Sequence, residues 1–359
     1  MQPSAVSSKW NFWLPAIERR MPVVLAAILG SLLFAAHTQA QFVGTQGTQF
    51  VYQGSSITFY GSTFYPSTIG GTSAWHSMNF PSYIDQMIGL AQQGGLNILR
   101  PSDFFYKNRP GQDPYEPVVW ANMDYLVSAA SATGMFVVMD VSAYRWLLES
   151  DGQNSTDPNN WYAFIDFVAA RYANTPTVAF YYILGEPTVP TDGPSADALV
   201  AFYDGVTTRF RSDDPNHRIC AGGFNHMEDH PELSWWQRIY SLTNNDIGGY
   251  KTYSQHDLDY VATVTSYTNS INKPAFEAEF GIPQYMGDCV WSGQTFNSIH
   301  TSRADFCANV YDRGLAGGTA AFVFWNLGNQ VGDTSYNVSP TVSPCTWAVI
   351  QQYAWPPVP

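Results

Sequence analysis

Charged side chains are scarce in this chain, and positive ones especially so. Lys, Arg, Asp and Glu make up 13% of 359 residues, with 16 basic against 29 acidic side chains. The formal net charge of −13 argues against nucleic acid or an anionic membrane surface as a partner, because both would repel the chain. So low a charged fraction is also unusual for a soluble cytosolic protein.

Cysteine is also sparse, and four residues are too few to define a disulfide-stapled scaffold. Cys220 lies in an apolar run, which predicts a buried thiol. Cys289, Cys307 and Cys345 gather toward the C-terminus, and the sequence leaves open which pair among them is bridged. No CxxC or Cys/His metal spacing occurs. We expect a protein that requires neither a metal nor an organic cofactor.

Long apolar runs are absent except near the N-terminus. Arg19 and Arg20 precede an apolar stretch at 21–36, and small or polar residues follow as far as Ala40. This pattern is typical of a signal peptide, and the stretch is shorter than the roughly 20 residues of a membrane span. We therefore expect export, with a mature, secreted chain beginning near Gln41 and no membrane contact after cleavage. An uncleaved N-terminal anchor is the alternative.

Aromatic residues, in contrast, are abundant. The chain has 12 Trp, 22 Tyr and 22 Phe, and 45% of its residues are hydrophobic. Most of these rings are expected to fill a large core, and the remainder suit stacking on the apolar faces of sugar rings.

Short apolar runs alternate with amphipathic stretches along the whole of 41–359. The runs are nearly continuous in Val, Ile, Phe and Tyr, as is typical of parallel strands covered on both faces. About eight strand–helix repeats predict a single α/β domain, a (β/α)8 TIM barrel. The expected strands are 57–62, 96–99, 135–139, 178–183, 218–221, 246–250, 274–278 and 319–324. The expected helices are 83–93, 120–132, 161–172, 196–210, 258–271 and 302–312.

Two of the expected strands lead into carboxylates. The apolar run at 181–187 reaches Glu186 just before a proline, and the run at 274–281 reaches Glu279 two residues before a glycine. An ionised carboxylate at the end of a buried strand is costly, which suggests that it has a function. The carboxyl ends of barrel strands surround one pocket, and a pair of acids there is what glycosidic bond cleavage requires.

The order and spacing of several short segments are similar to those of glycoside hydrolase family 5, in clan A. They are 59–65 at the first strand, 95–100 at the second, 214–218 before the fifth, and the two stretches that carry Glu186 and Glu279. The resemblance covers most of the mature chain. It implies a divergent member of this family of cellulase-like and mannanase-like enzymes.

The resemblance also implies a retaining, endo-acting hydrolase with Glu279 as nucleophile and Glu186 as acid/base. The implied substrate is a β-1,4-linked polysaccharide or oligosaccharide, and mannan and glucan remain equally open. An exo-β-glycosidase, a transglycosylase and a catalytically weak carbohydrate-binding protein on the same scaffold are the alternatives. We expect a monomer.

Supporting residues follow from the same resemblance. Arg100 corresponds to an arginine near the nucleophile, Tyr253 to a tyrosine that hydrogen-bonds it, and Trp325 to the floor beneath the sugar. Arg100 could instead be a salt-bridge residue of the core, and Trp325 could instead serve packing alone. Glu277 alternates with Glu279 along its strand and should therefore point away from the pocket.

Three positions depart from the family pattern. Gly185 stands where an Asn that contacts the sugar 2-hydroxyl is usual, and Lys251 and Ser142 stand where histidines are usual. Asn225 or His226, after the fifth strand, could compensate for the missing contact. These departures suggest altered subsites or reduced activity.

A further set of residues is expected near the cleft because each follows the end of a strand. Trp146 is expected in the cleft, and the Trp pair after the fifth strand fits distal subsites and core packing equally well. The residues concerned are Asp103, Phe104, Phe105, Trp146, Trp235 and Trp236.

Overall fold

The computed structural model describes residues 41–66 and 69–354. The predicted export segment at 1–40 lies outside the described residues. Within them, no helix is both long enough and apolar enough to cross a membrane.

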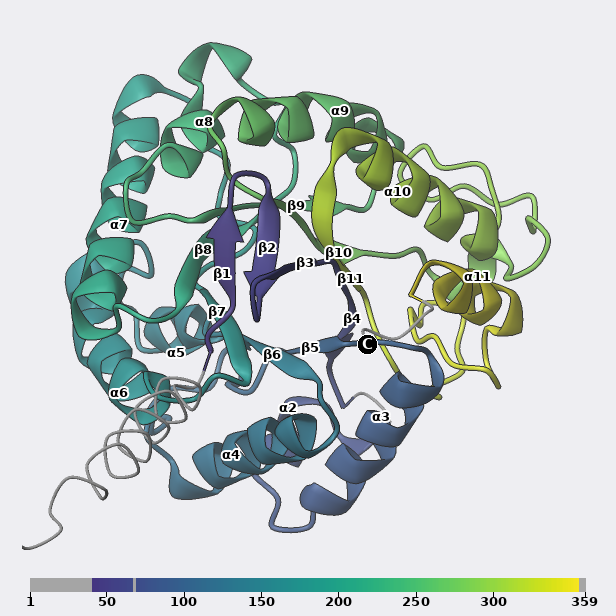
Figure 1. Cartoon of the computed structure of the whole chain (residues 1–359), viewed down its shortest axis with the longest axis horizontal. Helices are drawn as coiled ribbons and strands as arrows, with labels where there is room; N and C mark the ends of the chain where they lie inside the picture. The colour runs from purple at the N-terminus through teal and green to yellow at the C-terminus, as the bar shows by residue number, and fades with distance from the viewer. Residues whose placement is uncertain (1–40, 67–68, 355–359) are drawn as a thin grey trace, which may run out of the picture. The chain divides into compact units, whose positions relative to one another are not determined.

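Eight parallel strands close into a barrel in the order β10-β11-β4-β5-β6-β7-β8-β9, which confirms the predicted (β/α)8 fold (Figure 1). The strands coincide with the expected apolar runs to within a few residues. They are β4 (Phe59–Phe64), β5 (Ile98–Pro101), β6 (Phe136–Asp140), β7 (Val178–Tyr182), β8 (Arg218–Phe224), β9 (Ile247–Thr252), β10 (Ala275–Phe280) and β11 (Thr319–Phe324).

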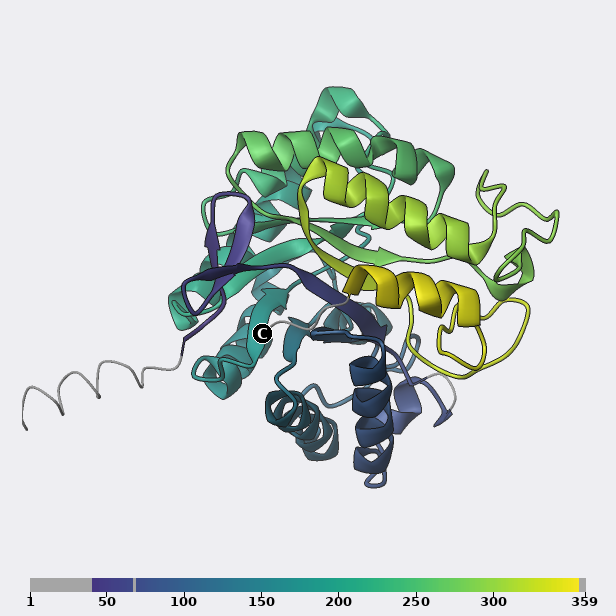
Figure 2. The same cartoon turned by 45° about the vertical axis from the view of Figure 1, so that its right-hand side comes forward.

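Helices surround the barrel and cover the outer faces of its strands (Figures 1 and 2). Several begin at residues whose side chains accept a backbone N–H, as Asp192, Ser254 and Ser302 do. The stretch after β8 forms only two short helices, a 3-10 helix at Pro231–Leu233 and α8. The helices are α2 (Thr72–Trp75), α3 (Pro81–Gln93), α4 (Pro117–Ala132), α5 (Tyr144–Ser150), α6 (Tyr162–Tyr172), α7 (Gly193–Asp213), α8 (Trp235–Tyr240), α9 (Gln255–Ser270), α10 (Arg303–Gly317) and α11 (Pro344–Ala354).

A small antiparallel sheet closes one end of the barrel. Its strands are β1 (Gly44–Gln46), β2 (Gln49–Tyr52) and β3 (Ser55–Ile57). Phe50 of β2 packs on Phe59 and Phe180, with ring centroids 5.2 and 5.6 Å apart, inside the barrel core. Phe59 is the first residue of β4, so the sheet covers the end where the strands begin. A substrate must therefore approach the opposite end, where the strands finish.

Four aromatic residues suggested for the cleft belong to the core. Phe104 and Phe105 are buried, and Phe104 packs edge-on against Trp120 of α4. The expectation that they line the cleft is wrong, because the chain after β5 turns these rings inward beneath the helices. Trp235 and Trp236 are buried in the same cluster, so the packing alternative holds for them.

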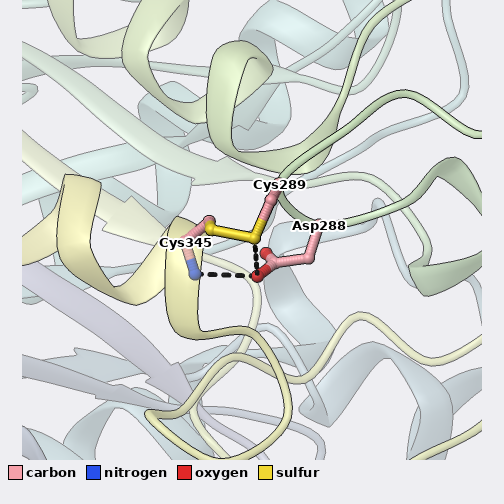
Figure 3. Close-up of side chains that lie close together, drawn as sticks. All are labelled: Asp288, Cys289 and Cys345. Atoms are coloured by element: carbon pink, nitrogen blue, oxygen red, sulfur yellow. Dashed lines mark hydrogen bonds between the residues drawn. A yellow bond between two sulfur atoms is a disulfide. The ribbon is translucent and has the colours of Figure 1, made fainter.

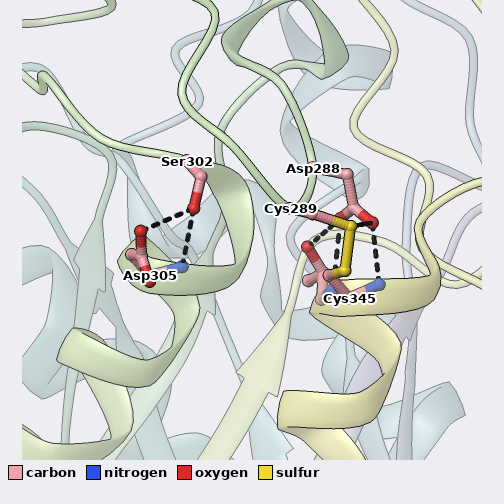
Figure 4. Close-up of a disulfide and its surroundings, with 6 residues drawn as sticks. Asp288, Cys289, Ser302, Asp305 and Cys345 are labelled. Atoms are coloured by element: carbon pink, nitrogen blue, oxygen red, sulfur yellow. Dashed lines mark hydrogen bonds between the residues drawn. A yellow bond between two sulfur atoms is a disulfide. The ribbon is translucent and has the colours of Figure 1, made fainter.

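One disulfide joins Cys289, in the loop after β10, to Cys345 in the first turn of α11. Figure 3 shows the Asp288 carboxylate beside it, where it accepts the backbone N–H of Cys345 at 2.8 Å. Figure 4 shows the neighbouring start of α10, where Ser302 caps the helix. Cys307 is a buried free thiol, as is Cys220, which confirms the prediction for Cys220.

Candidate active site

Two carboxylates from different strands meet at the open end of the barrel. Glu279 is the fifth residue of β10, and Glu186 lies just beyond the end of β7. The ammonium of Lys251, on β9, lies 2.9 Å from Oε2 of Glu279 and 3.3 Å from Oε1 of Glu186. Since both oxygens contact the same nitrogen, Oε2 of Glu279 and Oε1 of Glu186 are at most 6.2 Å apart.

Glu279 is almost buried, with 7% of its surface exposed, and both of its oxygens are held. Tyr253 donates its hydroxyl to Oε1 at 2.6 Å. Arg100 and Lys251 both donate to Oε2. The structure thus brings the predicted Arg100 and Tyr253 together on Glu279, and it adds Lys251.

The charges around Glu279 determine its ionisation. Burial alone would raise the pKa of this carboxyl, but the cations of Lys251 and Arg100 and the hydrogen bond from Tyr253 lower it to about 2. Glu279 is therefore an anion at any ordinary pH, in the orientation that its three partners fix.

Arg100 is itself buried and anchored on its far side. It donates to Thr63 at 2.9 Å and forms an ion pair with Asp140 at 3.2 Å. Burial would lower the pKa of Arg100, but Glu279 and Asp140 raise it above its usual value. Asp140 in turn accepts the backbone N–H of Ser142 at 2.8 Å and its hydroxyl at 2.5 Å. Ser142 thus supports Glu279 indirectly, through Asp140 and Arg100.

The main chain holds Glu186 in place and leaves its side chain accessible. Its φ of 50° lies in the left-handed region, which a non-glycine residue adopts only when its surroundings require it. Here Arg145 donates to the carbonyl oxygens of Gly185 and Glu186 at 2.8 and 3.0 Å, and the Glu186 N–H donates to Gly223 at 3.0 Å. The Glu186 side chain is 37% exposed.

Glu186 lines a cleft of about 660 Å³. Tyr253, Asn225 and His226 line the same cleft, so these predicted residues lie beside the acid. The sequence did not single out the remaining lining residues, which come from the segments after β8, β9, β10 and β11 and carry no motif. They are Glu228, Asp229, Ser254, His256, Asp257, Phe296, Asn297, Ser298 and Tyr336.

Two predicted tryptophans have other neighbours. Trp325 stacks on Tyr65, with ring centroids 5.7 Å apart. Trp146 has the ammonium of Lys107 3.7 Å and the guanidinium of Arg145 3.9 Å from its ring centroid. Neither tryptophan is among the described residues that line the 660 Å³ cleft, and their roles in substrate binding remain predictions.

Gly185 and Glu277 have clear structural explanations. A Cβ added at Gly185 would lie 2.1 Å from the hydroxyl oxygen of Tyr182 and 3.3 Å from Cε of Lys251. A side chain at position 185 is thus excluded while these two residues keep their places. Glu277 is buried and accepts the hydroxyl of Thr252 at 2.7 Å, as expected for a structural acid.

Comparison with known proteins assigns the family. The model of the cellulase family, glycosyl hydrolase family 5, matches residues 58–292. The chain belongs to this family. It is 25% identical over 304 residues to a protein named probable mannan endo-1,4-beta-mannosidase C from Aspergillus terreus, covering 68% of this chain and 71% of that protein. The family membership makes this chain an O-glycosyl hydrolase.

Solved structures support the fold independently. An endo-1,4-beta-D-mannanase from Thermotoga petrophila RKU-1 superposes with a TM-score of 0.64 at 17% identity, covering 83% of this chain and 99% of that one. The catalytic domain of the major endoglucanase from Xanthomonas campestris pv. campestris gives 0.58 at 14% identity, covering 87% and 99%. At such low identities these likenesses establish the barrel and leave the substrate open.

Proposed function

We propose that this chain hydrolyses a β-1,4-linked polysaccharide with retention of configuration, using Glu279 as nucleophile and Glu186 as acid/base. One observation carries the proposal, namely that Oε2 of Glu279 and Oε1 of Glu186 are at most 6.2 Å apart. Retaining enzymes hold their two carboxyls about 5–5.5 Å apart, whereas inverting enzymes need about 6.5–9.5 Å to fit a water molecule.

In the first step, Glu279 attacks the anomeric carbon as the leaving oxygen departs. Glu279 suits this role because it is ionised and oriented before the substrate arrives. Glu186, the more accessible of the two, gives its proton to the leaving oxygen. The products of this step are an ester between the sugar and Glu279 and a free chain end.

In the second step, a water molecule replaces the departed chain end beside Glu186. The Glu186 carboxylate takes a proton from this water, which attacks the anomeric carbon and releases Glu279 as an anion. Arg100, Lys251 and Tyr253 stabilise that anion, so they favour this step in particular. A sugar hydroxyl in place of water would give transglycosylation instead.

Mannan is the first substrate to test, because two sequence relatives are named as probable mannan endo-1,4-beta-mannosidases. Glucan is the second, because a structural neighbour is an endoglucanase. We further propose that the enzyme is exported after cleavage near Gln41 and acts as a monomer. Amino-terminal sequencing and light scattering of the secreted protein would test these points, and an intact N-terminus or a dimer would contradict them.

The direct test is release of reducing sugar by residues 41–359 from mannan, glucomannan, carboxymethylcellulose and xylan. We expect activity on mannan or glucan, and loss of at least about a thousandfold in Glu186→Gln and in Glu279→Gln. Glu232→Gln, a change at an exposed acid outside the cleft, is the matched control and should keep full activity. A folded protein that is silent on all four polymers, or unchanged in both variants, would contradict the proposal.

Gly185 keeps one other function open, that of a sugar-binding protein with little turnover. Oligosaccharide binding by calorimetry without any product would favour it. A glycosyl ester on Glu279 would exclude it.

A further inference from the structure

Lys251 occupies an unusual place for an ammonium group. Its side chain is 7% exposed, and it lies between the two carboxylates that the proposed mechanism uses. Within residues 41–66 and 69–354, the one acceptor to which it donates a hydrogen bond is Glu279, while Glu186 lies within ion-pair distance. An ammonium carries three N–H donors, so donors remain for a further partner.

The surroundings fix the position of this ammonium. The Lys251 stem passes beside two glycines, with Cε 3.3 Å from the place of a Cβ at Gly185 and Cγ 3.1 Å from that at Gly223. The hydroxyl oxygen of Tyr182 lies 2.1 and 2.9 Å from the same two Cβ positions and accepts the N–H of Gly223 at 2.8 Å. Two glycines and one buried phenol thus pack around the lysine side chain where it approaches the carboxylate pair.

The position of the ammonium determines which part of a substrate it meets. In the proposed reaction, the anomeric carbon must lie between Glu279, which attacks it, and Glu186, which protonates the bond that breaks. Lys251 is within 3.3 Å of an oxygen of each carboxylate, so it lies beside that carbon. Three oxygens of the sugar lie near that carbon, namely the glycosidic oxygen, the ring oxygen and the 2-hydroxyl. Glu186 protonates the first, and the second gains positive charge in the oxocarbenium-like transition state, so the 2-hydroxyl is the one that suits a cationic donor.

We propose that Lys251 donates a hydrogen bond to the sugar 2-hydroxyl. The enzyme thereby distinguishes a sugar that carries this hydroxyl from one that lacks it. The inference rests on the proposed function, because it requires a sugar held between Glu186 and Glu279. Hydrogen bonds to the 2-hydroxyl strengthen as the ring approaches the transition state, so this contact contributes to turnover as well as to binding.

The test removes each partner in turn. A nitrophenyl β-disaccharide of the cleaved series is compared with its analogue that lacks the 2-hydroxyl on the sugar next to the nitrophenyl group. The original enzyme should prefer the complete substrate in kcat/KM by at least about tenfold, as expected for a charge-assisted hydrogen bond. Lys251→Met should lose most of that preference, and Lys251→Gln, which restores a donor, should recover part of it.

Tyr253→Phe is the matched control, because it also removes a partner of Glu279 but leaves Lys251 in place. It should lower kcat/KM on both substrates and keep the preference between them. A preference that is the same in Lys251→Met as in the original enzyme would overturn the inference, even if all variants hydrolyse the complete substrate.

Binding provides a readout that does not depend on turnover. Calorimetry with a pair of imino sugars that differ only in the 2-hydroxyl should show the same loss of discrimination in Lys251→Met. If the original enzyme binds both imino sugars equally, the inference fails whatever the outcome for hydrolysis. If it neither binds nor cleaves any sugar, the proposed function fails and the inference fails with it.

Discussion

Among the single residues, Glu279 owes its ionisation and its orientation to the side chains that contact it. Two cations and one phenol hold its two oxygens, and burial prevents water from replacing them. An anion so well stabilised leaves readily in the second step of the proposed mechanism and attacks less readily in the first. Formation of the glycosyl ester, rather than its hydrolysis, is therefore expected to limit the rate with natural substrates.

The first prediction concerns the pH dependence of activity. Glu279 acts as its anion, so activity is lost as the pH falls through its pKa, which Lys251 and Arg100 help to lower to about 2. Lys251→Met removes one of these charges, which raises that pKa and moves the acid limb of the kcat/KM profile upward by about one unit or more. Tyr253→Phe removes a hydrogen bond but no charge, so its limb should move less. Coincident acid limbs in all three proteins would contradict this account.

The contacts of Glu279 were predictable only in part. A strand-end position and the family pattern led to Arg100 and Tyr253, and the structure shows both donating to Glu279. Lys251 was identified only as a departure from the pattern. Its role as a bridge could not be foreseen, because it depends on the absence of a side chain at Gly185 and on the position of Tyr182, which lie at and just beyond the end of another strand.

Among the secondary-structure elements, the end of β7 combines a phenol, a glycine and a glutamate whose backbone is in the left-handed region. Tyr182 ends the strand, Gly185 leaves room for its hydroxyl, and Glu186 follows with a φ of 50°. These three features depend on one another, since a side chain at 185 would displace the phenol. The phenol in turn supports the N–H of Gly223 on β8.

The second prediction tests this dependence by a double-mutant cycle. Gly185→Ala places a Cβ 2.1 Å from the Tyr182 hydroxyl oxygen, so it should destabilise the fold by about 1–3 kcal/mol. In Tyr182→Phe that oxygen is gone and the nearest remaining ring carbon would lie 3.1 Å away, so the added methyl should cost clearly less there. Urea unfolding of the four proteins gives the comparison. Additive effects of the two substitutions would show that the two positions are independent.

The third prediction concerns the loop after β10. The Cys289–Cys345 disulfide closes a segment with a sequence separation of 56, which includes this loop and the start of α11. Replacing both cysteines by serine should lower the free energy of unfolding by about 2–4 kcal/mol. A reducing agent should likewise lower the melting temperature of the original protein and leave that of the double variant unchanged. Equal sensitivity of both proteins to reductant would contradict the assigned pairing.

At the scale of the whole molecule, the barrel was predictable because each of its strands is a local apolar run between turn residues. The small sheet that closes one end was not predicted as a separate element, since its strands are only three or four residues long. Phe104 and Phe105 show a second limit. Their place after a strand suggested the cleft. The path of the chain, which no local pattern specifies, instead packs Phe104 against α4 and Phe105 against α5 and α6.

The negative net charge of the chain and the acidic residues of its cleft fit an uncharged substrate such as a neutral polysaccharide. Glu228, Asp229 and Asp257 line the cleft together with Glu186, and the chain as a whole carries a formal charge of −13. A polyanionic ligand would be repelled both at a distance and within the cleft. The charge of the whole chain and the two carboxylates thus favour the same kind of ligand. Glu279 is held as an anion, and Glu186 is exposed to the ligand.

Mass spectrometry of Glu186→Ala after reaction with a 2,4-dinitrophenyl β-glycoside would show directly whether Glu279 is the nucleophile. This leaving group needs no acid, so Glu279 can still form its ester, and without a base at 186 the ester should accumulate. We expect one added glycosyl unit on the peptide that contains Glu279, and none when Glu279 is also replaced by Gln. An adduct on another residue, or turnover to a product of inverted configuration without any adduct, would contradict this expectation.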